Sequence, residues 1–428
     1  MNVAVIGGGY AGMAAAVTLA EERISVTVFE AGKSLGGRAR RIEHHGLTLD
    51  NGLHVLIGAY RETLRLIQLV GADANRLLLR VPFTWHMHEQ FFFRARNLPV
   101  PLHLLAGLLS ARGVSLGERL GAARFLVAMR RARFRLPRDI SVASLLAQER
   151  QGAALTRLLW RPLCVSALNT PPETASAQVF LNVLRDSLGA GLGASDLLLP
   201  RADLSRLFPD PARAWVQQRG GTVLTGERVT AIDASVGGYA VRHTAGEETF
   251  SHVICALAPQ HVKAFLIGIS ALAEIAEQLE RYAYQPIYSV YLQYPGEVAL
   301  AAPMLGFESA LLQWAFDRGA LCGQRGLIGA VISAEGMHQE HPHEELALLV
   351  HQELQQQIGQ LPSPRWSRVI AEKRATFACV QGLARPENRT PLRNFYLAGD
   401  YTASDYPATL ESAVRSGIGA ARLVLGTA

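Results

Sequence analysis

Residues 2–30 read NVAVIGGGYAGMAAAVTLAEERISVTVFE, and this stretch decides the fold. An apolar strand at residues 3–6 runs into a glycine turn, then into a helix of small residues that ends near Ala20, and then into a second strand, Val26–Glu30. That order of elements is typical of the βαβ unit that binds a dinucleotide. The chain is therefore predicted to be an α/β protein that opens with a Rossmann-like domain.

Three glycines of the turn each meet a separate steric requirement of a dinucleotide site. Gly7 permits the tight turn, Gly9 lets backbone amides approach a pyrophosphate, and Gly12 lets the helix pack closely on the strand. Tyr10 and Ala11 stand at the start of the helix, where free N–H groups and the positive end of the helix dipole attract phosphate. We expect all five residues to contact the cofactor.

Glu30 ends the second strand, 18 residues after Gly12. A carboxylate in this place can accept hydrogen bonds from the hydroxyls of an adenosine ribose, which argues against a 2′-phosphate. Gly36, Gly37 and Arg38 follow and offer a second close backbone approach and a cation beside the same cofactor. A plain turn with a solvated arginine is the alternative for this second segment.

This second segment resembles the glycine–glycine–arginine motif of the flavin amine oxidase and phytoene desaturase superfamily. The resemblance implies that the dinucleotide is FAD and that Glu30, Gly36, Gly37 and Arg38 bind it. It also implies a Rossmann-like FAD-binding domain joined to a second domain for the substrate.

The other end of the chain carries a matching motif. Residues 397–400 read LAGD and residues 407–413 read PATLESA, so an apolar strand ends at Gly399 and Asp400 and a helix begins after the proline. These segments resemble the C-terminal FAD motif of the same superfamily. The Asp400 carboxylate can bind a ribityl hydroxyl, and the helix N-terminus near Thr409 and Leu410 can direct its dipole at the flavin pyrimidine edge.

A third piece lies between the two ends. Residues 220–223 and 227–232 read as a glycine turn and short strands, and in members of the superfamily the backbone at the position of Val229 meets the adenine. The FAD-binding domain is thus expected to be discontinuous. We expect it to comprise residues 1–75, 210–260 and 370–428, with an α+β substrate-binding domain at 76–209 and 261–369.

The composition indicates a globular chain that is rich in apolar residues. Hydrophobic residues make up 49% of the 428 residues and charged residues 18%, which excludes a disordered chain. No apolar run reaches about 18 residues, so a spanning helix is not expected. Residues 98–138 alternate leucines with arginines and predict basic amphipathic helices that can lie on a membrane surface. An ordinary core-facing helix pair with solvated arginines is the alternative.

Charge and cysteine usage narrow the partners. The net charge is +6, but the 39 arginines are scattered and not interleaved with aromatics, so nucleic acid is not expected as a partner. The four cysteines are widely spaced, without a C-x-x-C pair or a histidine cluster, so neither a metal site nor a disulfide framework is expected. We expect a cytoplasmic protein, peripheral on the inner face of the cytoplasmic membrane.

Three further segments, residues 50–60, 160–177 and 372–377, extend the resemblance to essentially the full length. Together with the FAD motifs they resemble the hydroxysqualene dehydroxylase family of bacterial hopanoid synthesis. The resemblance implies that reduced FAD delivers hydride to hydroxysqualene as its hydroxyl departs, giving squalene. Only one dinucleotide fingerprint is present, so the electron donor that reduces the flavin is an unidentified partner.

Loss of hydroxide from an allylic alcohol needs a proton donor. His54 is our hypothesis, because the turn at residues 50–54 should lie near the flavin and a histidine can hold a proton near neutrality. Asn51 and Gly52 in the same turn are expected to contact the flavin edge. The rival donors that the sequence leaves unranked are Asp50, Tyr60, Tyr288 and Arg374.

Three other functions stay open at this point. A carotenoid-type desaturase would use oxidised FAD on a polyene and has nearly the same sequence scaffold. An amine oxidase-like enzyme is less favoured, because no pair of aromatics flanks the C-terminal motif to cage an amine. A non-enzymatic prenyl-lipid carrier would have no need for an intact Asp400 motif.

Overall fold

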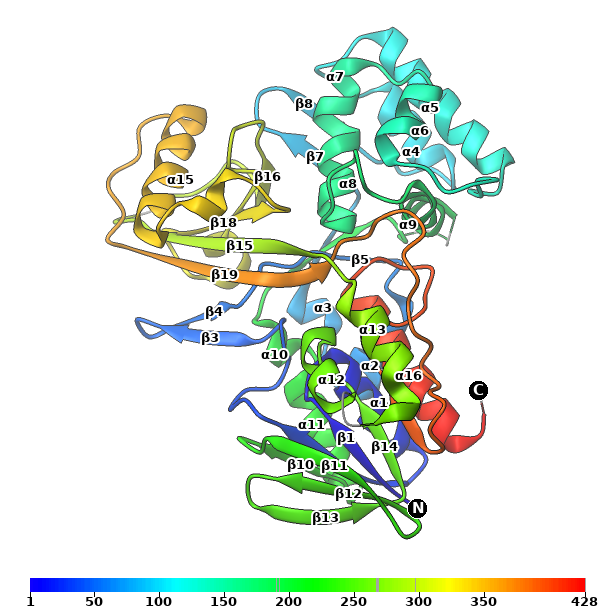
Figure 1. Ribbon diagram of the computed structural model, residues 1–428. Helices are drawn as coiled ribbons and strands as arrows, with labels where there is room; N and C mark the ends of the chain where they lie inside the picture. Colours follow the sequence, from blue (N-terminus) through cyan, green and yellow to red (C-terminus); the bar gives the residue numbers. More distant parts are fainter. Residues whose placement is uncertain (190, 192, 267–268, 297, 428) are drawn as a thin grey trace.

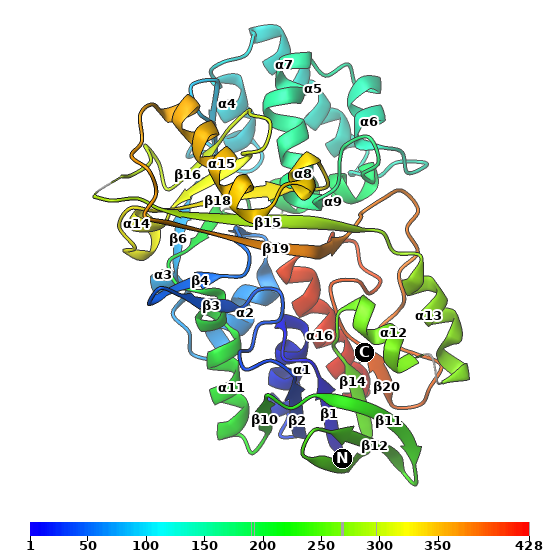
Figure 2. The same cartoon turned by 60° about the vertical axis from the view of Figure 1, so that its left-hand side comes forward.

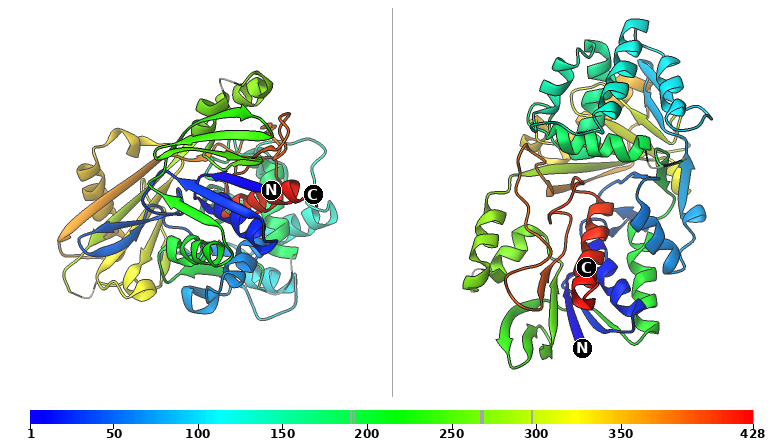
Figure 3. Two further views of the ribbon diagram at one scale, coloured as in Figure 1. Left: turned by 90° about the horizontal axis from the view of Figure 1, so that it is seen from below. Right: turned by 90° about the vertical axis from the view of Figure 1, so that its right-hand side faces the viewer.

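The computed structural model describes residues 1–189, 191, 193–266, 269–296 and 298–427. Figure 1 shows a parallel sheet at the lower end, near both chain termini, a larger sheet across the middle, and a helical lobe at the far upper end. The view from the right-hand side in Figure 3 keeps the same order from bottom to top.

The lower sheet confirms the predicted Rossmann-like architecture. Its five strands are ordered β10-β2-β1-β14-β20, and all neighbours are parallel. The strands are β1 (Asn2–Ile6), β2 (Ser25–Glu30), β10 (Thr222–Thr225), β14 (His252–Cys255) and β20 (Phe395–Leu397). The sheet thus combines strands from the three expected pieces of the chain.

Both faces of this sheet are covered because successive side chains of β1 point in opposite directions. Val3 and Val5 pack in a cluster with the helices on one face, whereas Ala4 and Ile6 pack with the β-meander on the other. The helices are α1 (Tyr10–Glu21), α11 (Pro209–Gln218) and α16 (Leu410–Leu425). The meander consists of β11 (Val229–Ser235), β12 (Gly238–His243) and β13 (Gly246–Phe250), and the Phe29 and Phe250 rings meet edge to face at 5.8 Å.

A seven-stranded sheet crosses the middle of the molecule in the order β19-β15-β18-β17-β16-β7-β8. Its strands are β7 (Thr84–Met87), β8 (Phe91–Arg94), β15 (Tyr284–Gln293), β16 (Met304–Gly306), β17 (Trp314–Asp317), β18 (Leu327–Ser333) and β19 (Trp366–Phe377). One face packs on α15 (His343–Ile358). The other face turns toward β4 (Leu47–Asp50), since the Tyr291 hydroxyl donates to the Asp50 carbonyl oxygen at 2.9 Å.

The helical lobe comprises the elements between β8 and β9. They are α4 (Leu102–Leu109), α5 (Leu116–Arg131), α6 (Val142–Gln148), α7 (Ala153–Leu155), the π-helix η1 (Thr156–Trp160), α8 (Arg161–Leu168) and α9 (Ala177–Gly189). A helix pair is present in residues 98–138 as α4 and α5, but α4 contains no arginine or lysine, so the arginines of this stretch lie in α5 and in the segments around the two helices. No helix in the described part of the chain is long and apolar enough to cross a bilayer.

Shorter elements join these layers. They are β3 (Arg41–His44), β5 (Leu56–Ile57), α2 (Arg61–Leu69), α3 (Ala74–Leu77), β6 (Leu78–Val81), β9 (Leu197–Pro200), α10 (Leu204–Leu207), α12 (Pro259–Leu266), η2 (Ser270–Leu272), α13 (Ala273–Glu280), α14 (Arg318–Cys322) and η3 (Met337–Glu340). The expected domain boundary at residue 370 falls inside β19, and α12 and α13 lie beside β14 rather than with the middle sheet (Figure 2). The proposed division into two domains stays a prediction.

Candidate functional site

The glycine turn lies between β1 and α1, as predicted. Gly7 has a φ of +108° and donates its N–H to the Phe29 carbonyl oxygen at 2.8 Å. A Cβ on Gly12 would lie only 1.9 Å from the Gly7 carbonyl oxygen, so this position requires glycine. Gly9 is the N-cap of α1, and neither a side-chain cap nor an acidic residue occupies the first turn. The N–H groups of that turn are thus available to the pyrophosphate of a dinucleotide.

Tyr10 and Ala11 contribute to this turn through their backbone. The Tyr10 hydroxyl donates to the Leu204 carbonyl oxygen at 2.8 Å, and its ring packs on Phe208. A Cβ on Gly417 would lie 2.0 Å from the Ala11 carbonyl oxygen, because α1 and α16 cross in close contact there. The side chains of both residues therefore belong to the core, and only their amides fit a cofactor.

Glu30 stands at the tip of β2 against the same turn. Its carboxylate accepts hydrogen bonds from the N–H groups of Gly8 and Gly32, each at 2.7 Å. The N–H of Glu227 donates to the Glu30 carbonyl oxygen at 2.9 Å, which holds the start of β11 beside this tip. Val229 buries its side chain there, so its backbone is the part that can face an adenine.

The second glycine pair lies alongside the first. Gly36 donates its N–H to the Gly8 carbonyl oxygen at 2.9 Å, and Gly9 and Gly36 form a parallel β-bridge. Gly36 and Gly37 have φ values of +115° and +60°, and a Cβ on Gly37 would lie 3.3 Å from the Gly9 Cα. Two backbone segments without side chains therefore meet where the sequence predicts a pyrophosphate.

An ion pair connects the two ends of the chain. The Arg38 guanidinium donates through Nη2 to Asp400 Oδ1 at 2.7 Å, although the residues are 362 positions apart. Arg38 also donates through Nη1 to the Ala375 carbonyl oxygen. Burial opposes the charge of Arg38, but Asp400 outweighs this effect and the pKa of Arg38 is raised. The structure thus places the N-terminal and C-terminal FAD motifs in one site.

Arg385 supports this site and was missed by sequence reasoning. It donates to the carbonyl oxygens of Asp400 at 2.6 Å and of Tyr406 at 2.7 Å, which fixes the loop between β20 and α16. The Gly399 N–H donates to the Ser416 hydroxyl at 2.9 Å. Because Arg385 binds backbone carbonyls, no side chain in the loop indicates from the sequence that Arg385 is its partner.

The N-terminus of α16, whose dipole is expected to point at the flavin, carries a buried acidic residue. Thr409 caps the helix by accepting the Ser412 N–H at 3.2 Å, and Leu410 begins it. Glu411 is fully buried in the first turn and accepts from the N–H and the hydroxyl of Thr63 in α2, at 2.9 and 2.8 Å. The Glu411 carboxylate offsets part of the positive end of the helix dipole. Arg415 in turn neutralises Glu411, since its Nε donates to Glu411 Oε1 at 2.7 Å.

The turn after β4 lies beside the Arg38–Asp400 pair, and its contact with the flavin stays a prediction. The Asn51 side chain donates through Nδ2 to the Arg38 carbonyl oxygen at 3.1 Å, and the Asn51 N–H donates to the Arg40 carbonyl oxygen at 2.9 Å. The His54 Nδ1 lies 2.7 Å from the Gly52 carbonyl oxygen. Asn51, Gly52 and His54 are therefore held next to the Arg38–Asp400 pair.

The surroundings of His54 disfavour its protonated form. Burial lowers its pKa, its hydrogen bond to the Gly52 carbonyl oxygen opposes that effect, and the Arg38 charge lowers the pKa further. A carbonyl oxygen only accepts, so Nδ1 carries the proton and Nε2 of the neutral ring is an acceptor. The lowered pKa disfavours the imidazolium form of His54, and its role as an acid stays a prediction.

The rival donors occupy different places. Asp50 is buried, accepts the Leu204 N–H at 2.8 Å and lies 3.3 Å from Arg318, and burial raises its pKa to about 6 although Arg318 lowers it. Tyr60 is the N-cap residue of α2 and hydrogen-bonds Thr409, and burial raises its pKa.

Tyr288 and Arg374 lie on strands of the middle sheet. Tyr288 packs on His338, in the core that includes α15, on the face of the sheet turned away from β4. Arg374 lies 5.7 Å over the Tyr284 ring, and the charges of Arg38 and Asp400 both act on Tyr284. The structure therefore favours Arg374 over Tyr288 as a neighbour of the Arg38–Asp400 pair.

An apolar cluster lies beside this turn. Leu53 and Val55 are half-buried and pack against this large cluster, which includes Trp85, Trp314 and Phe316. The Trp85 and Trp314 rings meet edge to face at 4.7 Å, and the Trp314 Nε1 donates to the Ser166 hydroxyl of α8 at 3.0 Å. The surroundings of Gly52 on this side therefore suit an apolar ligand.

Comparisons with known proteins agree with this geometry. Residues 10–425 match the protein family described as flavin containing amine oxidoreductase. The chain is 30% identical to a hydroxysqualene dehydroxylase of Rhodopseudomonas palustris, over 99% of this chain and 98% of that one. It is 25% identical to a zeta-carotene desaturase of Zea mays, over 97% and 82%. A solved structure of putrescine oxidase shares the fold, with a TM-score of 0.74 at 15% identity, and covers 100% of this chain and 99% of that one.

Proposed function

Because the chain belongs to the flavin-containing amine oxidoreductase family and is an FAD-dependent oxidoreductase similar to hydroxysqualene dehydroxylases, we propose that it converts hydroxysqualene to squalene in hopanoid synthesis. The observation that carries the proposal is that both FAD motifs meet in one site. Relatives that match this chain over nearly its full length are hydroxysqualene dehydroxylases. We place the enzyme in the cytoplasm, on the inner face of the membrane.

The residues of this chain fit FAD. Gly7, Gly9 and Gly12 admit the pyrophosphate, and the Glu30 carboxylate, which already orders the Gly8 and Gly32 amides, accepts from the ribose hydroxyls. Asp400 keeps one carboxylate oxygen for a ribityl hydroxyl while the other binds Arg38. Once reduced, FAD supplies a hydride equivalent.

The reaction balances as R–OH plus hydride plus a proton giving R–H and water. The C–O bond breaks, the carbon gains the hydride, and the oxygen leaves with the proton. Leu53, Val55 and the aromatic residues behind them exclude water, which would otherwise recapture the cationic carbon. In this proposal His54 delivers the proton from Nε2, which requires the imidazolium form and therefore a pH below its ordinary pKa.

Carotenoid-type desaturation is the second candidate, and the similarity to the Zea mays zeta-carotene desaturase favours it. It would remove two hydrogens from a polyene with oxidised FAD and would need no proton donor. The two reactions require opposite redox states of the same cofactor.

Product analysis separates the two candidates. The purified protein is incubated anaerobically with hydroxysqualene in the reduced state and with phytoene or zeta-carotene in the oxidised state, and the lipids are extracted. Squalene from the first mixture supports the dehydroxylase. Further conjugated double bonds in the second mixture, with hydroxysqualene unchanged in the first, would replace it with the desaturase.

A further inference from the structure

The helices α4 and α5 present apolar side chains to solvent. Six of the ten exposed large apolar side chains among the described residues lie between residues 98 and 127. Leu102 and Leu109 are two helical turns apart on α4, so they share a face, and they are 53% and 40% exposed. Leu116, Leu120 and Val127 share a face of α5 in the same way. The opposite faces are buried and comprise Leu104, Leu108, Ala122, Phe125 and Met129.

This region also concentrates positive charge. Residues 91–138 contain ten arginines and one glutamate, a formal charge of +9, whereas the whole chain has +6, so the remaining residues carry −3. The glutamate, Glu118, is occupied by the capping box of α5 and by the N–H groups of Ala154 and Leu155. None of the ten arginines forms an ion pair with a described residue. Arg124 and Arg131 are exposed on the face of α5 that carries Leu120 and Val127.

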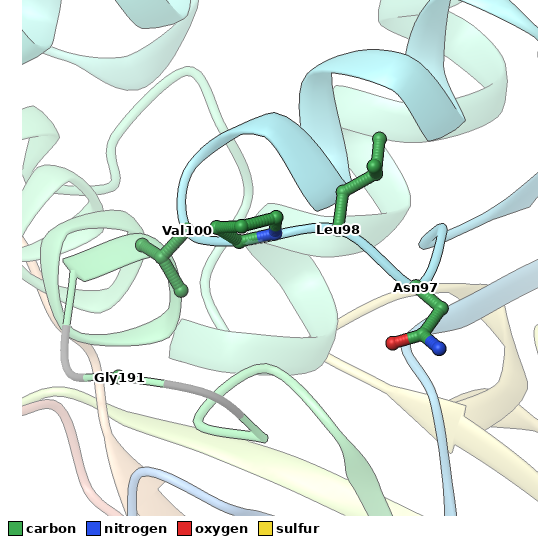
Figure 4. Close-up of a pocket in the computed structure, with 5 residues that line it drawn as sticks. Asn97, Leu98, Val100 and Gly191 are labelled. Atoms are coloured by element: carbon green, nitrogen blue, oxygen red, sulfur yellow. The ribbon is translucent and has the colours of Figure 1, made fainter.

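Two apolar depressions open in the same region. One, between α4 and α5, is lined by Leu105, Leu126 and Val127, with Arg130 and Arg185 at its edge. The other lies at the loop before α4, where Leu98 and Val100 project from one segment and residue 191 lies across from them (Figure 4). Both are in the lobe at the end of the molecule farthest from the N-terminus, and the FAD motifs lie below it (Figure 1).

We propose that the exposed faces of α4 and α5, with the loop at residues 97–100, form a surface that docks on an anionic phospholipid bilayer. The leucines insert among the acyl chains, and the surrounding arginines bind the phosphate groups. The proposal rests on the function proposed above, because it names the surface through which an apolar polyprenoid held in a membrane reaches this lobe. Its test requires neither substrate nor turnover.

Charge complementarity selects the bilayer over a second copy of the chain. Self-association through this surface would place one segment of +9 against another, which is repulsive. A bilayer containing phosphatidylglycerol has the opposite charge and also accepts leucine side chains. An anionic bilayer therefore meets both features of the surface at once.

Sedimentation with lipid vesicles tests the surface in the full-length, FAD-loaded protein. Vesicles of phosphatidylglycerol with phosphatidylcholine are compared with vesicles of phosphatidylcholine alone. Leu116→Ser/Leu120→Ser removes the apolar contribution and Arg124→Glu/Arg131→Glu reverses the charge. Leu348→Ser on α15 and Arg368→Glu on β19 are matched controls, because both are exposed outside the surface. Wild-type FAD content verifies the fold of each variant.

We expect the wild type and both controls to bind the anionic vesicles, and each double variant to partition at least tenfold less. Equal binding to phosphatidylcholine alone would overturn the anionic assignment, and unchanged binding of both double variants would overturn the surface. If the double variants lose vesicle binding and the protein does not convert hydroxysqualene, the docking surface is supported and only the proposed reaction is refuted. Conversion of detergent-dispersed hydroxysqualene without vesicle binding would refute the surface alone.

Discussion

The FAD-binding end and the α4–α5 lobe of this molecule differ in whether their charged side chains have partners within the chain. At the FAD-binding end Arg38 pairs with Asp400, Glu30 binds two backbone amides and Arg385 binds backbone carbonyls, so the charges are used within the chain. In the lobe, no arginine of residues 91–138 forms an ion pair with an acidic residue in the described part of the chain, and leucines face solvent. The contrast teaches that the first region is organised around a bound small molecule and the second around a surface outside the protein.

A glycine-to-alanine substitution in each region gives the largest expected difference in FAD content between the two regions. Gly12→Ala places a Cβ 1.9 Å from the Gly7 carbonyl oxygen, so the backbone must shift, and we expect loss of nearly all bound FAD and a fall of about 1–3 kcal/mol in the free energy of unfolding. Gly117→Ala in α5 meets only the Ser115 hydroxyl at 3.9 Å and should leave both unchanged or raise stability slightly. Flavin absorbance and denaturant unfolding measure the two effects, and equal outcomes would remove the contrast.

Removing the carboxylate that joins the two chain ends comes next. Asp400→Ala leaves the Arg38 guanidinium without its ion-pair partner and deletes the predicted ribityl contact, so we expect FAD to bind about tenfold more weakly. Titration of the apoprotein with FAD gives the dissociation constant. Arg124→Ala in the lobe is the control and should bind FAD as the wild type does. An unchanged dissociation constant in Asp400→Ala would contradict the placement of this residue.

The pH dependence of stability sharpens the description of His54. Its pKa is lowered in the folded state, so the unfolded chain binds this proton more readily, and stability should fall as the pH drops below about 6.5, by up to ~1.4 kcal/mol per pH unit. His54→Gln keeps a donor for the Gly52 carbonyl oxygen and should lack this part of the loss. Urea unfolding at several pH values measures it, and parallel curves for the two proteins would show that the pKa is not lowered.

A substitution on the exposed face of α4 gives the smallest effect. Leu102→Ser changes an exposed side chain and should alter the free energy of unfolding by less than about 0.5 kcal/mol. Leu104→Ala on the buried face is the comparison and should cost about 2–5 kcal/mol. A large loss of stability in Leu102→Ser would mean that this face belongs to the core and not to a docking surface.

Local signals made the FAD-binding end predictable. Gly7 and Gly12 specify the turn and the helix packing within a dozen residues, so the βαβ unit follows from sequence. The resemblance to a family implied that Arg38 and Asp400 serve one FAD site, but their direct contact, which spans 362 positions of the chain, was not predicted. Arg385 and Glu411 bind backbone groups or a distant helix, and no spacing rule marks such partners.

The face of Tyr288 and the protonation of His54 were beyond sequence reasoning for physical reasons. The pairing of β15 with β19 shifts register between Gln285 and Ile287, and Tyr284 and Tyr288 pack in clusters on opposite faces although their spacing is even. The pKa of His54 depends on burial and on Arg38, which are properties of the folded chain.

The central claim is tested most directly by a single turnover. The protein is reduced with dithionite under anaerobic conditions, freed of excess reductant and mixed with hydroxysqualene while flavin absorbance is followed and the lipid product is extracted. The account predicts that the flavin becomes oxidised as squalene forms, one molecule for each flavin. A flavin that stays reduced, with hydroxysqualene recovered intact, would contradict it.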